Sequence, residues 1–187
     1  MPIPSALTKN SFDVRWYSLR RPATTDAPLI WRKWLLDPGS LTQRLIEASH
    51  GDFRVEVIRQ GWYRPTRSEA KALKIPTRQL AIIREVQLIG NGQPWVFARS
   101  IIPASTLTGK QRELNFIGSR SLGTILFRDP TMKRGPLQVS KLKLTNGETV
   151  WARRSVFELS GKPLLVCEVF LPALLQVNYP VTPHQDN

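Results

Sequence analysis

Three tight-turn signals constrain the fold of this chain more than any other feature of its sequence. Gly90-Asn91-Gly92, Asn146-Gly147 and Ser160-Gly161 each separate two segments that are rich in strand-forming residues. Turns with Asn or Gly at the positions of positive φ join neighbouring antiparallel strands. Successive strands joined in this way are antiparallel neighbours, so the second half of the chain is expected to form a sheet of hairpins.

The flanking segments complete an α+β pattern. Strands are expected over residues 54–61, 80–89, 95–102, 137–144, 150–159 and 164–171, and the alternation of the first is broken at Ile58. Helices are expected over residues 28–36, after Ser40, over 68–73 as a helix or turn, and as patches near 108–111 and 122–127. Ser40 with Gln43 three positions later is a capping-box pattern. We predict a single antiparallel sheet with helices packed on one face.

The length of 187 residues fits one domain. Residues 1–27 are expected to be an extended lead-in, residues 28–172 the domain, and residues 173–187 a frayed C-terminal tail. No window approaches the ~18 uninterrupted apolar residues of a membrane-spanning helix. The N-terminus also lacks the apolar stretch of a secretory signal peptide, so a cytoplasmic protein is expected.

The balance of charge predicts an affinity for anions. There are 27 Lys and Arg residues against 14 Asp and Glu residues, which gives a net charge of +13. Such an excess attracts nucleic acids, anionic lipid surfaces and small carboxylates alike. The basic residues are spread singly or in pairs, without a polybasic tail or a nucleic-acid-binding signature. A solvated basic surface is therefore the expected role of most of them, and no nucleic-acid partner is expected.

Cysteine and histidine offer little for metal or nucleophilic chemistry. The chain has one cysteine, Cys167, and two histidines, His50 and His184, which lie far apart in the sequence. This excludes an intramolecular disulfide and a cysteine-based metal cage, and it disfavours a histidine-centred triad. We expect no metal and no cofactor, so that any chemistry falls to Arg, Lys, carboxylates, hydroxyls and backbone amides.

Two charged residues lie where strand alternation predicts an apolar face. Arg84 shares its face with Leu80, Ile82, Val86 and Leu88, and Glu168 shares its face with Leu164, Val166 and Phe170. Burial of an unpaired charge costs several kcal/mol, so each group needs a partner. The pattern leaves two alternatives open: a core salt bridge between Arg84 and Glu168, or a closed pocket in which a ligand carboxylate pairs with Arg84.

Two further arginines fall in similar positions. Arg99 lies on the predicted face of Trp95, Phe97 and Ile101, and Arg153 lies on that of Trp151, Phe157 and Leu159. Three arginines against one glutamate leave surplus positive charge, which favours an anionic ligand. The planar guanidinium suits such a ligand because it binds a carboxylate through two parallel hydrogen bonds.

Several segments, read in order, resemble the chorismate lyase family. The similarity covers roughly residues 28–172. The segments are Ile83-Arg84-Glu85, Gly92-Gln93-Pro94-Trp95, the run from Ala98 to Leu107, Leu122-Gly123, Trp151-Ala152-Arg153-Arg154-Ser155, the run from Leu159 to Leu165, and Glu168-Val169-Phe170-Leu171-Pro172. The order and the spacing of these segments carry the resemblance more than any one of them does.

The resemblance implies an antiparallel sheet with helical flaps over an internal ligand pocket, and a lyase that converts chorismate to 4-hydroxybenzoate and pyruvate. It implies that Arg84 and Glu168 bind the two ends of 4-hydroxybenzoate, and that backbone groups at Leu41 and Leu122 contribute further contacts. The position of Leu41 is often methionine in the family, so the sequence departs there. Arg99 or Arg153 is expected to pair with the departing pyruvyl carboxylate.

The resemblance also implies a role at the first committed step toward ubiquinone. We expect a monomer without a cofactor, whose basic surface offers a peripheral contact with anionic membranes.

Two rival interpretations remain at this stage. Effector-binding domains of some bacterial transcription regulators share this architecture and bind small carboxylated ligands without turning them over. They normally follow a winged-helix domain, for which residues 1–27 are too few. A basic nucleic-acid-binding protein is the third interpretation, and it would use the charge and the six tryptophans. Trp95 and Trp151 occupy positions typical of core packing, which disfavours it.

Overall fold

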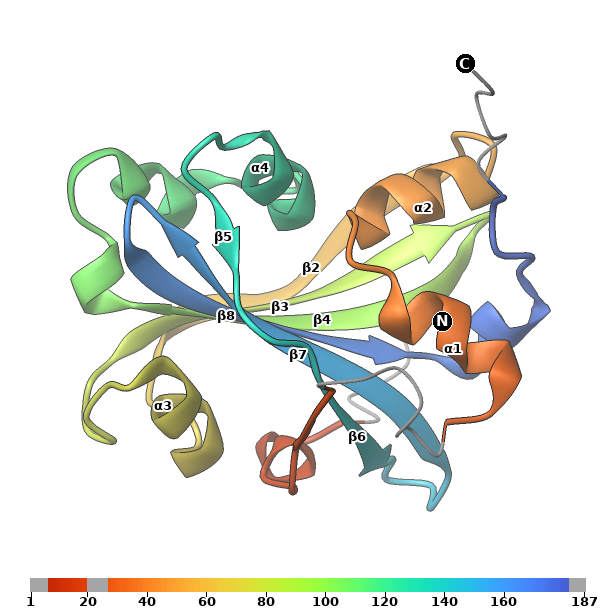
Figure 1. The fold of residues 1–187 in the computed structure, drawn as a ribbon, viewed down its shortest axis with the longest axis horizontal. Helices are drawn as coiled ribbons and strands as arrows, with labels where there is room; N and C mark the ends of the chain where they lie inside the picture. The colour runs from red at the N-terminus through yellow and green to blue at the C-terminus, as the bar shows by residue number, and fades with distance from the viewer. Residues whose placement is uncertain (1–6, 20–26, 182–187) are drawn as a thin grey trace.

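The fold is one twisted antiparallel sheet with helices on both of its faces (Figure 1). The computed structural model describes residues 7–19 and 27–181. The eight-stranded sheet has the order β1-β6-β7-β8-β4-β3-β2, and β5 pairs with β7 beside this path. The strands are β1 (Tyr17–Ser18), β2 (Phe53–Tyr63), β3 (Ala81–Gly90), β4 (Gln93–Pro103), β5 (Lys133–Arg134), β6 (Gln138–Lys143), β7 (Thr149–Leu159) and β8 (Lys162–Phe170).

The helical elements are short. The α-helices are α1 (Leu29–Leu36), α2 (Leu41–Ala48), α3 (Arg67–Leu73) and α4 (Leu122–Arg128). The 3₁₀ elements are η1 (Lys9–Phe12), η3 (Ala104–Thr106), η4 (Gly109–Phe116) and η5 (Pro172–Gln176). The helices expected before and after Ser40, near residue 68 and near residue 122 are confirmed, and the patch near residue 108 is a 3₁₀ helix. At Ser40 the side chain accepts the Gln43 amide, whereas the Gln43 side chain contacts Glu47.

The predicted hairpins are confirmed, and their turns explain the residues found there. Asn91 and Gly92 have φ values of 50° and 76°, as turns of this kind require. Gly90 is needed for another reason, since a Cβ at this position would lie 2.2 Å from the ring of Trp95. This close packing joins the β3–β4 hairpin to the core cluster that includes side chains of α1 and α2.

Two bulges adjust the strand register. The β2–β3 register shifts between Val57 and Arg59, which matches the break in alternation expected at Ile58. The β3–β4 register shifts beside Trp95, so that Arg84 lies opposite Ser100 and Glu85 lies opposite Arg99. Since a one-residue shift moves side chains to the other face, the second bulge decides where Arg99 points.

The helices divide between the two faces, which corrects the expectation that all of them lie on one. The α2 and α4 helices lie on one side of the sheet in Figure 1, and α3 lies on the other. The α1 helix packs on the α2 side, because its Trp31 and Trp34 share a core cluster with Leu41. Leu73 of α3 packs with Ile83, Ile101 and Leu165, whereas Leu41 of α2 packs with side chains of the opposite face. The α+β class with one antiparallel sheet is confirmed.

The packed domain extends beyond residues 28–172 at both ends. Phe12 of η1 is buried against β4 and β7, within the segment expected to be a lead-in. Leu174 of η5 is fully buried, and Tyr179 hydrogen-bonds to Asp37, within the segment expected to be a frayed tail. Residues 1–6, 20–26 and 182–187, including His184, lie outside the described residues. Within the described ranges no helix is long and apolar enough to cross a membrane.

Candidate functional site

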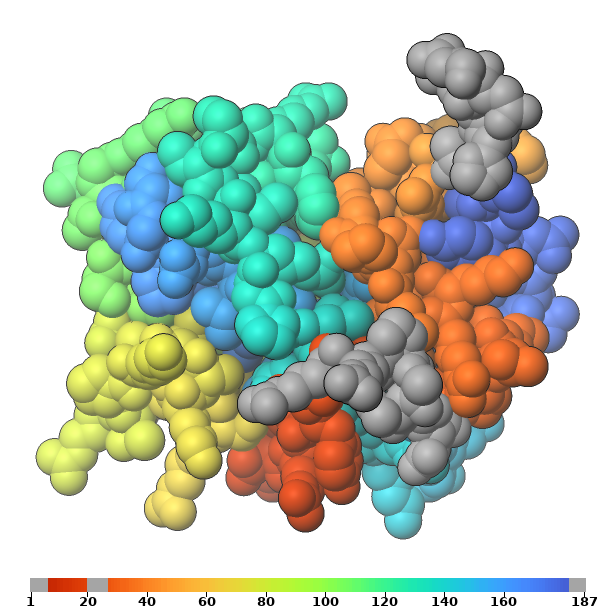
Figure 2. Space-filling view, in the orientation of Figure 1, coloured from red at the N-terminus to blue at the C-terminus, as the bar shows by residue number. Residues whose placement is uncertain are grey.

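A pocket lies between the sheet and the helices α2 and α4. Its floor is formed by β3, β4, β7 and β8 with Val55 of β2, and its roof by the first turn of α2 and by α4. Figure 2 shows the α1–α2 segment in orange beside the α4–β5 segment in teal, so both cover this region. The cavity is narrow, with a volume of about 40 Å³. Most of the wall is apolar, as is usual for small-molecule sites, and the charged lining residues are Arg84, Arg134, Arg153 and Glu168.

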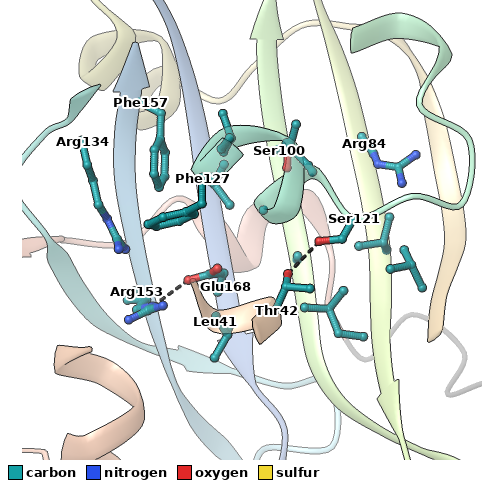
Figure 3. Close-up of a pocket in the computed structure, with 18 of the residues that line it drawn as sticks. Leu41, Thr42, Arg84, Ser100, Ser121, Phe127, Arg134, Arg153, Phe157 and Glu168 are labelled. Carbon is teal, nitrogen blue, oxygen red and sulfur yellow. Dashed lines mark hydrogen bonds and ion pairs between the residues drawn. The ribbon is translucent and has the colours of Figure 1, made fainter. Parts of the chain in front are cut away.

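Arg84 projects from β3 into one end of the pocket (Figure 3). It is only 2% exposed, and its Nη1 donates to Gln60 Oε1 at 2.9 Å while its Nη2 donates to the Arg120 carbonyl at 3.0 Å. Both acceptors are neutral, and burial lowers the pKa of Arg84. Among the described residues no carboxylate forms an ion pair with it. The guanidinium is therefore fixed in orientation and left without a counter-ion.

Glu168 and Arg153 form an ion pair on neighbouring strands. Arg153 Nε donates to Glu168 Oε2 at 2.6 Å. Arg153 is only 1% exposed, and its Nη1 also donates to the carbonyls of Trp34, Leu35 and Asp37 at the C-terminal end of α1. Arg153 thus holds α1 to the sheet and fixes the Glu168 carboxylate at the pocket wall.

The core salt bridge between Arg84 and Glu168, one of the two alternatives left open by the sequence, is not formed. The two side chains line the same pocket from different strands and have separate partners. Figure 3 shows them on opposite sides of the hollow. The structure thus brings together the two residues that strand alternation marked, with space between them.

Arg134 is a pocket residue that no sequence pattern indicated. It comes from the two-residue strand β5, its Nε donates to Ser155 Oγ at 3.1 Å, and its Nη1 donates to the Pro38 carbonyl at 2.9 Å. Burial, with the neighbouring charge of Arg153, lowers the pKa of Arg134 to about 10. A strand of two residues has no alternation to interpret, so the only available signal was the Lys133-Arg134 pair itself.

Leu41 and Leu122 are the first residues of α2 and α4, and both line the pocket. The first N–H groups of a helix have no partner within it, so amides are available there. The two helix starts are joined by a 2.7 Å hydrogen bond between Thr42 and Ser121. A Cβ at position 123 would lie 2.8 Å from Thr42 Oγ1, which explains the glycine after Leu122.

Arg99 lies on the other face of the sheet, which corrects its assignment to the pocket. Its Nε donates to Glu69 Oε1 at 2.7 Å and its Nη1 donates to Glu85 Oε1 at 2.6 Å. Burial opposes its charge, but the two glutamates outweigh that effect and raise the pKa of Arg99. The cause of the misplacement is the bulge beside Trp95, which turns Arg99 toward α3. Arg99 is thus part of a neutralised structural cluster.

The pocket carries net positive charge. Three guanidinium groups and one carboxylate line it, which gives a surplus of two positive charges. In the described part of the chain no group of three or more His, Cys, Asp and Glu side chains is placed to hold a metal ion. Cys167 is buried, and burial raises the pKa of its thiol. The charge and the donor set of the pocket suit a small dianion.

The comparisons with known proteins agree with this geometry. The sequence model of the family described as chorismate lyase matches residues 14–178. This chain belongs to the chorismate lyase family. A probable chorismate pyruvate-lyase of Marinobacter nauticus is 44% identical over 78% of each chain. A probable chorismate pyruvate-lyase 2 of Pseudomonas entomophila is 42% identical over 90% of this chain and 94% of its own. The curated names support chorismate lyase activity.

Solved structures with a similar fold come from regulators. The ligand-binding domain of a putative GntR-family regulator from Bordetella bronchiseptica has a TM-score of 0.52 at 14% identity, covering 71% of this chain and 91% of its own. A GntR-family regulator from Bacillus cereus has a TM-score of 0.51 at 14% identity, covering 70% and 99%. At this level of identity the likeness concerns the fold alone.

Proposed function

We propose that this protein splits chorismate into 4-hydroxybenzoate and pyruvate. The observation that carries the proposal is the surplus of two positive charges in a largely apolar pocket that also holds one fixed carboxylate. Chorismate is a dianion with a ring carboxylate, an enolpyruvyl carboxylate and a ring hydroxyl. Two guanidiniums without counter-ions and one acceptor carboxylate complement these three groups.

The placement of the substrate follows from the two ends of the pocket. Arg84 would bind the ring carboxylate, with help from the backbone amides of Leu41 and Leu122. Glu168, across the hollow, would accept a hydrogen bond from the C4 hydroxyl, which is para to the ring carboxylate (Figure 3). The ring would lie on the apolar floor formed by residues such as Val86, Ala98 and Val166.

The reaction needs little from the protein beyond placement and electrostatics. The C3–O ether bond breaks, the hydrogen at C4 leaves, the ring becomes aromatic, and the enol of pyruvate gains a proton at its methylene carbon. If the C4 hydrogen passes directly to that methylene carbon, atoms balance without an external base, and Glu168 needs only to hold the hydroxyl. The pocket would select the reactive conformer and stabilise charge on the departing carboxylate.

An enclosed pocket that fits the product has a consequence for turnover. Arg84 and Glu168 would keep their contacts with 4-hydroxybenzoate after pyruvate leaves. The α2 and α4 roof must open for the product to escape, and such steps limit the rate of many enzymes. We therefore expect strong inhibition by 4-hydroxybenzoate.

The wider setting follows from the family resemblance. The product would enter ubiquinone synthesis at its first committed step, in the cytoplasm. The protein would act as a monomer, and its basic surface would allow peripheral contact with anionic membranes.

The decisive experiment measures turnover by the purified protein. Chorismate is added in the presence of a chelator, 4-hydroxybenzoate is followed by its ultraviolet absorbance, and pyruvate by a coupled reduction. We expect equal amounts of both products. Binding of chorismate without release of either product would overturn the proposal in favour of a carboxylate-binding module.

A further inference from the structure

We propose that Arg134 binds the enolpyruvyl carboxylate of the substrate and is the residue by which the pocket distinguishes chorismate from 4-hydroxybenzoate. This assignment rests on the proposed function and deepens it. It concerns a residue of β5, which lies outside the main path of the sheet and pairs only with β7 in the described part of the chain.

The Arg134 side chain is held as a wall of the pocket. Its guanidinium lies over the ring of Phe157, with 5.1 Å from its central carbon to the ring centre. It donates hydrogen bonds to the hydroxyl of Ser155 and to the backbone carbonyl of Pro38. No carboxylate of the described residues forms an ion pair with it. It is therefore oriented by neutral partners, as a ligand-binding guanidinium would be.

Arg134 lies at the end of the pocket where the arm of chorismate would be. Figure 3 shows its guanidinium directed toward Arg153 and Glu168, across the hollow from Arg84. In chorismate the arm is attached at C3, next to the hydroxyl-bearing C4 and away from the ring carboxylate at C1. If Arg84 binds the carboxylate at C1 and Glu168 binds the C4 hydroxyl, the enolpyruvyl carboxylate lies on the side of Arg134.

The buried arginines Arg153 and Arg99 are committed elsewhere. Arg153 donates to Glu168 and to three carbonyls of the α1 end. Arg99 lies on the opposite face and pairs with two glutamates. At this end of the pocket, Arg134 is thus the guanidinium that forms no ion pair with a carboxylate of the described residues.

The electrostatic setting favours an anion beside Arg134. Burial lowers the pKa of Arg134, and the charge of Arg153 acts in the same direction, only partly opposed by Glu168 and Asp37. A bound carboxylate would relieve this repulsion. The product 4-hydroxybenzoate has only one carboxylate, which Arg84 holds, so it would not use this contact.

The test compares substrate and product in one variant. Arg134→Met should lower kcat/KM for chorismate by at least about 30-fold, because a charged pairing is lost, while the affinity for 4-hydroxybenzoate changes by no more than about twofold. Lys133→Met is the matched control, since Lys133 is the exposed neighbour on the same strand and its loss removes the same charge. The control should resemble wild type in both measurements.

Three outcomes would overturn the assignment: unchanged kcat/KM in Arg134→Met, an equal loss of substrate and product affinity, or the same loss in Lys133→Met. If Arg134→Met does not fold, Arg134→Lys decides, because it keeps the charge without the fork. We then expect a several-fold lower kcat/KM with product affinity unchanged, and wild-type kcat/KM would refute the assignment. Turnover by wild type separates this test from the proposed function, since an inactive wild type would disprove the function itself.

Discussion

Arg99 and Arg84 are buried on opposite faces of the sheet and are held in opposite ways. On the α3 face, Arg99 forms ion pairs with Glu69 and Glu85. Arg154 on the same face donates to Ser68 Oγ and Gln138 Oε1, and burial lowers its pKa. On the pocket face, Arg84, Arg134 and Arg153 are accompanied only by Glu168. Arg99 and Arg84 are equally hidden from solvent, at 1% and 2% exposure, and they lie on adjacent strands. They differ in whether the protein supplies the counter-ion.

This difference teaches that burial of a charge does not by itself mark a functional site. A buried ion pair contributes to structure, because removal of one partner leaves the other uncompensated. A buried cation held only by neutral acceptors is costly for the fold, and it becomes favourable when an anion binds. The pocket thus gives up stability at Arg84 for ligand affinity, and the Arg99 cluster does not.

The largest expected effect is a loss of stability on substitution of Arg99. Arg99→Met should lower the free energy of unfolding by about 3–5 kcal/mol, because Glu69 and Glu85 lose their buried partner. Chemical denaturation measures this value. Arg59→Met is the matched control, since Arg59 also pairs with Glu85 but is 44% exposed, and it should cost no more than about 1 kcal/mol. An Arg99→Met protein as stable as wild type would show that the cluster is not structural.

The next effect concerns the carboxylate of the pocket. Glu168→Gln should weaken 4-hydroxybenzoate binding by about tenfold, because a charged acceptor becomes a neutral one of the same shape. Calorimetric titration measures the affinity, and Glu158→Gln, an exposed substitution on β7, serves as the control. Equal affinities in Glu168→Gln and the control would remove Glu168 from the binding site.

The smallest effect concerns Asp37, which follows the last residue of α1. Burial alone would raise the pKa of Asp37, but hydrogen bonds from Tyr179, Arg44 and the Gly39 amide outweigh it and lower the pKa below its usual 3.8. This stabilisation is present above the unfolded pKa and is lost as the pH falls through the lower folded value.

Asp37→Asn should therefore cost about 1–2 kcal/mol of unfolding free energy near pH 7, and less near pH 3. Denaturation at both pH values checks this prediction. An identical cost at both pH values would contradict it.

Much of the fold could be predicted from the sequence because its signals are local. The turns at Asn91-Gly92 and Ser160-Gly161 fix neighbouring strands, and simple alternation placed Arg84 and Glu168 on their pocket faces. Trp95 and Trp151 are buried in the core, as their positions indicated.

The failures have physical causes. A regular β3–β4 hairpin would place Arg99 opposite Arg84, but the bulge beside Trp95 pairs it with Glu85. The position of α3 depends on the pairing of Glu69 with Arg99 across the fold, which no local pattern encodes. Arg134 could not be assigned to a face from the sequence, because the two residues of β5 show no alternation.

Arg84 is a buried cation for which the described residues supply no carboxylate, so its partner is expected to be a ligand. The most direct test is the unfolding free energy of Arg84→Met, with and without 4-hydroxybenzoate at about 100 times the wild-type Kd. Without ligand the variant should stay within about 1 kcal/mol of wild type. With ligand, wild type should gain about 2.7 kcal/mol and the variant almost nothing. A ligand-free loss of several kcal/mol, as expected for Arg99→Met, or an equal gain with ligand, would contradict the account.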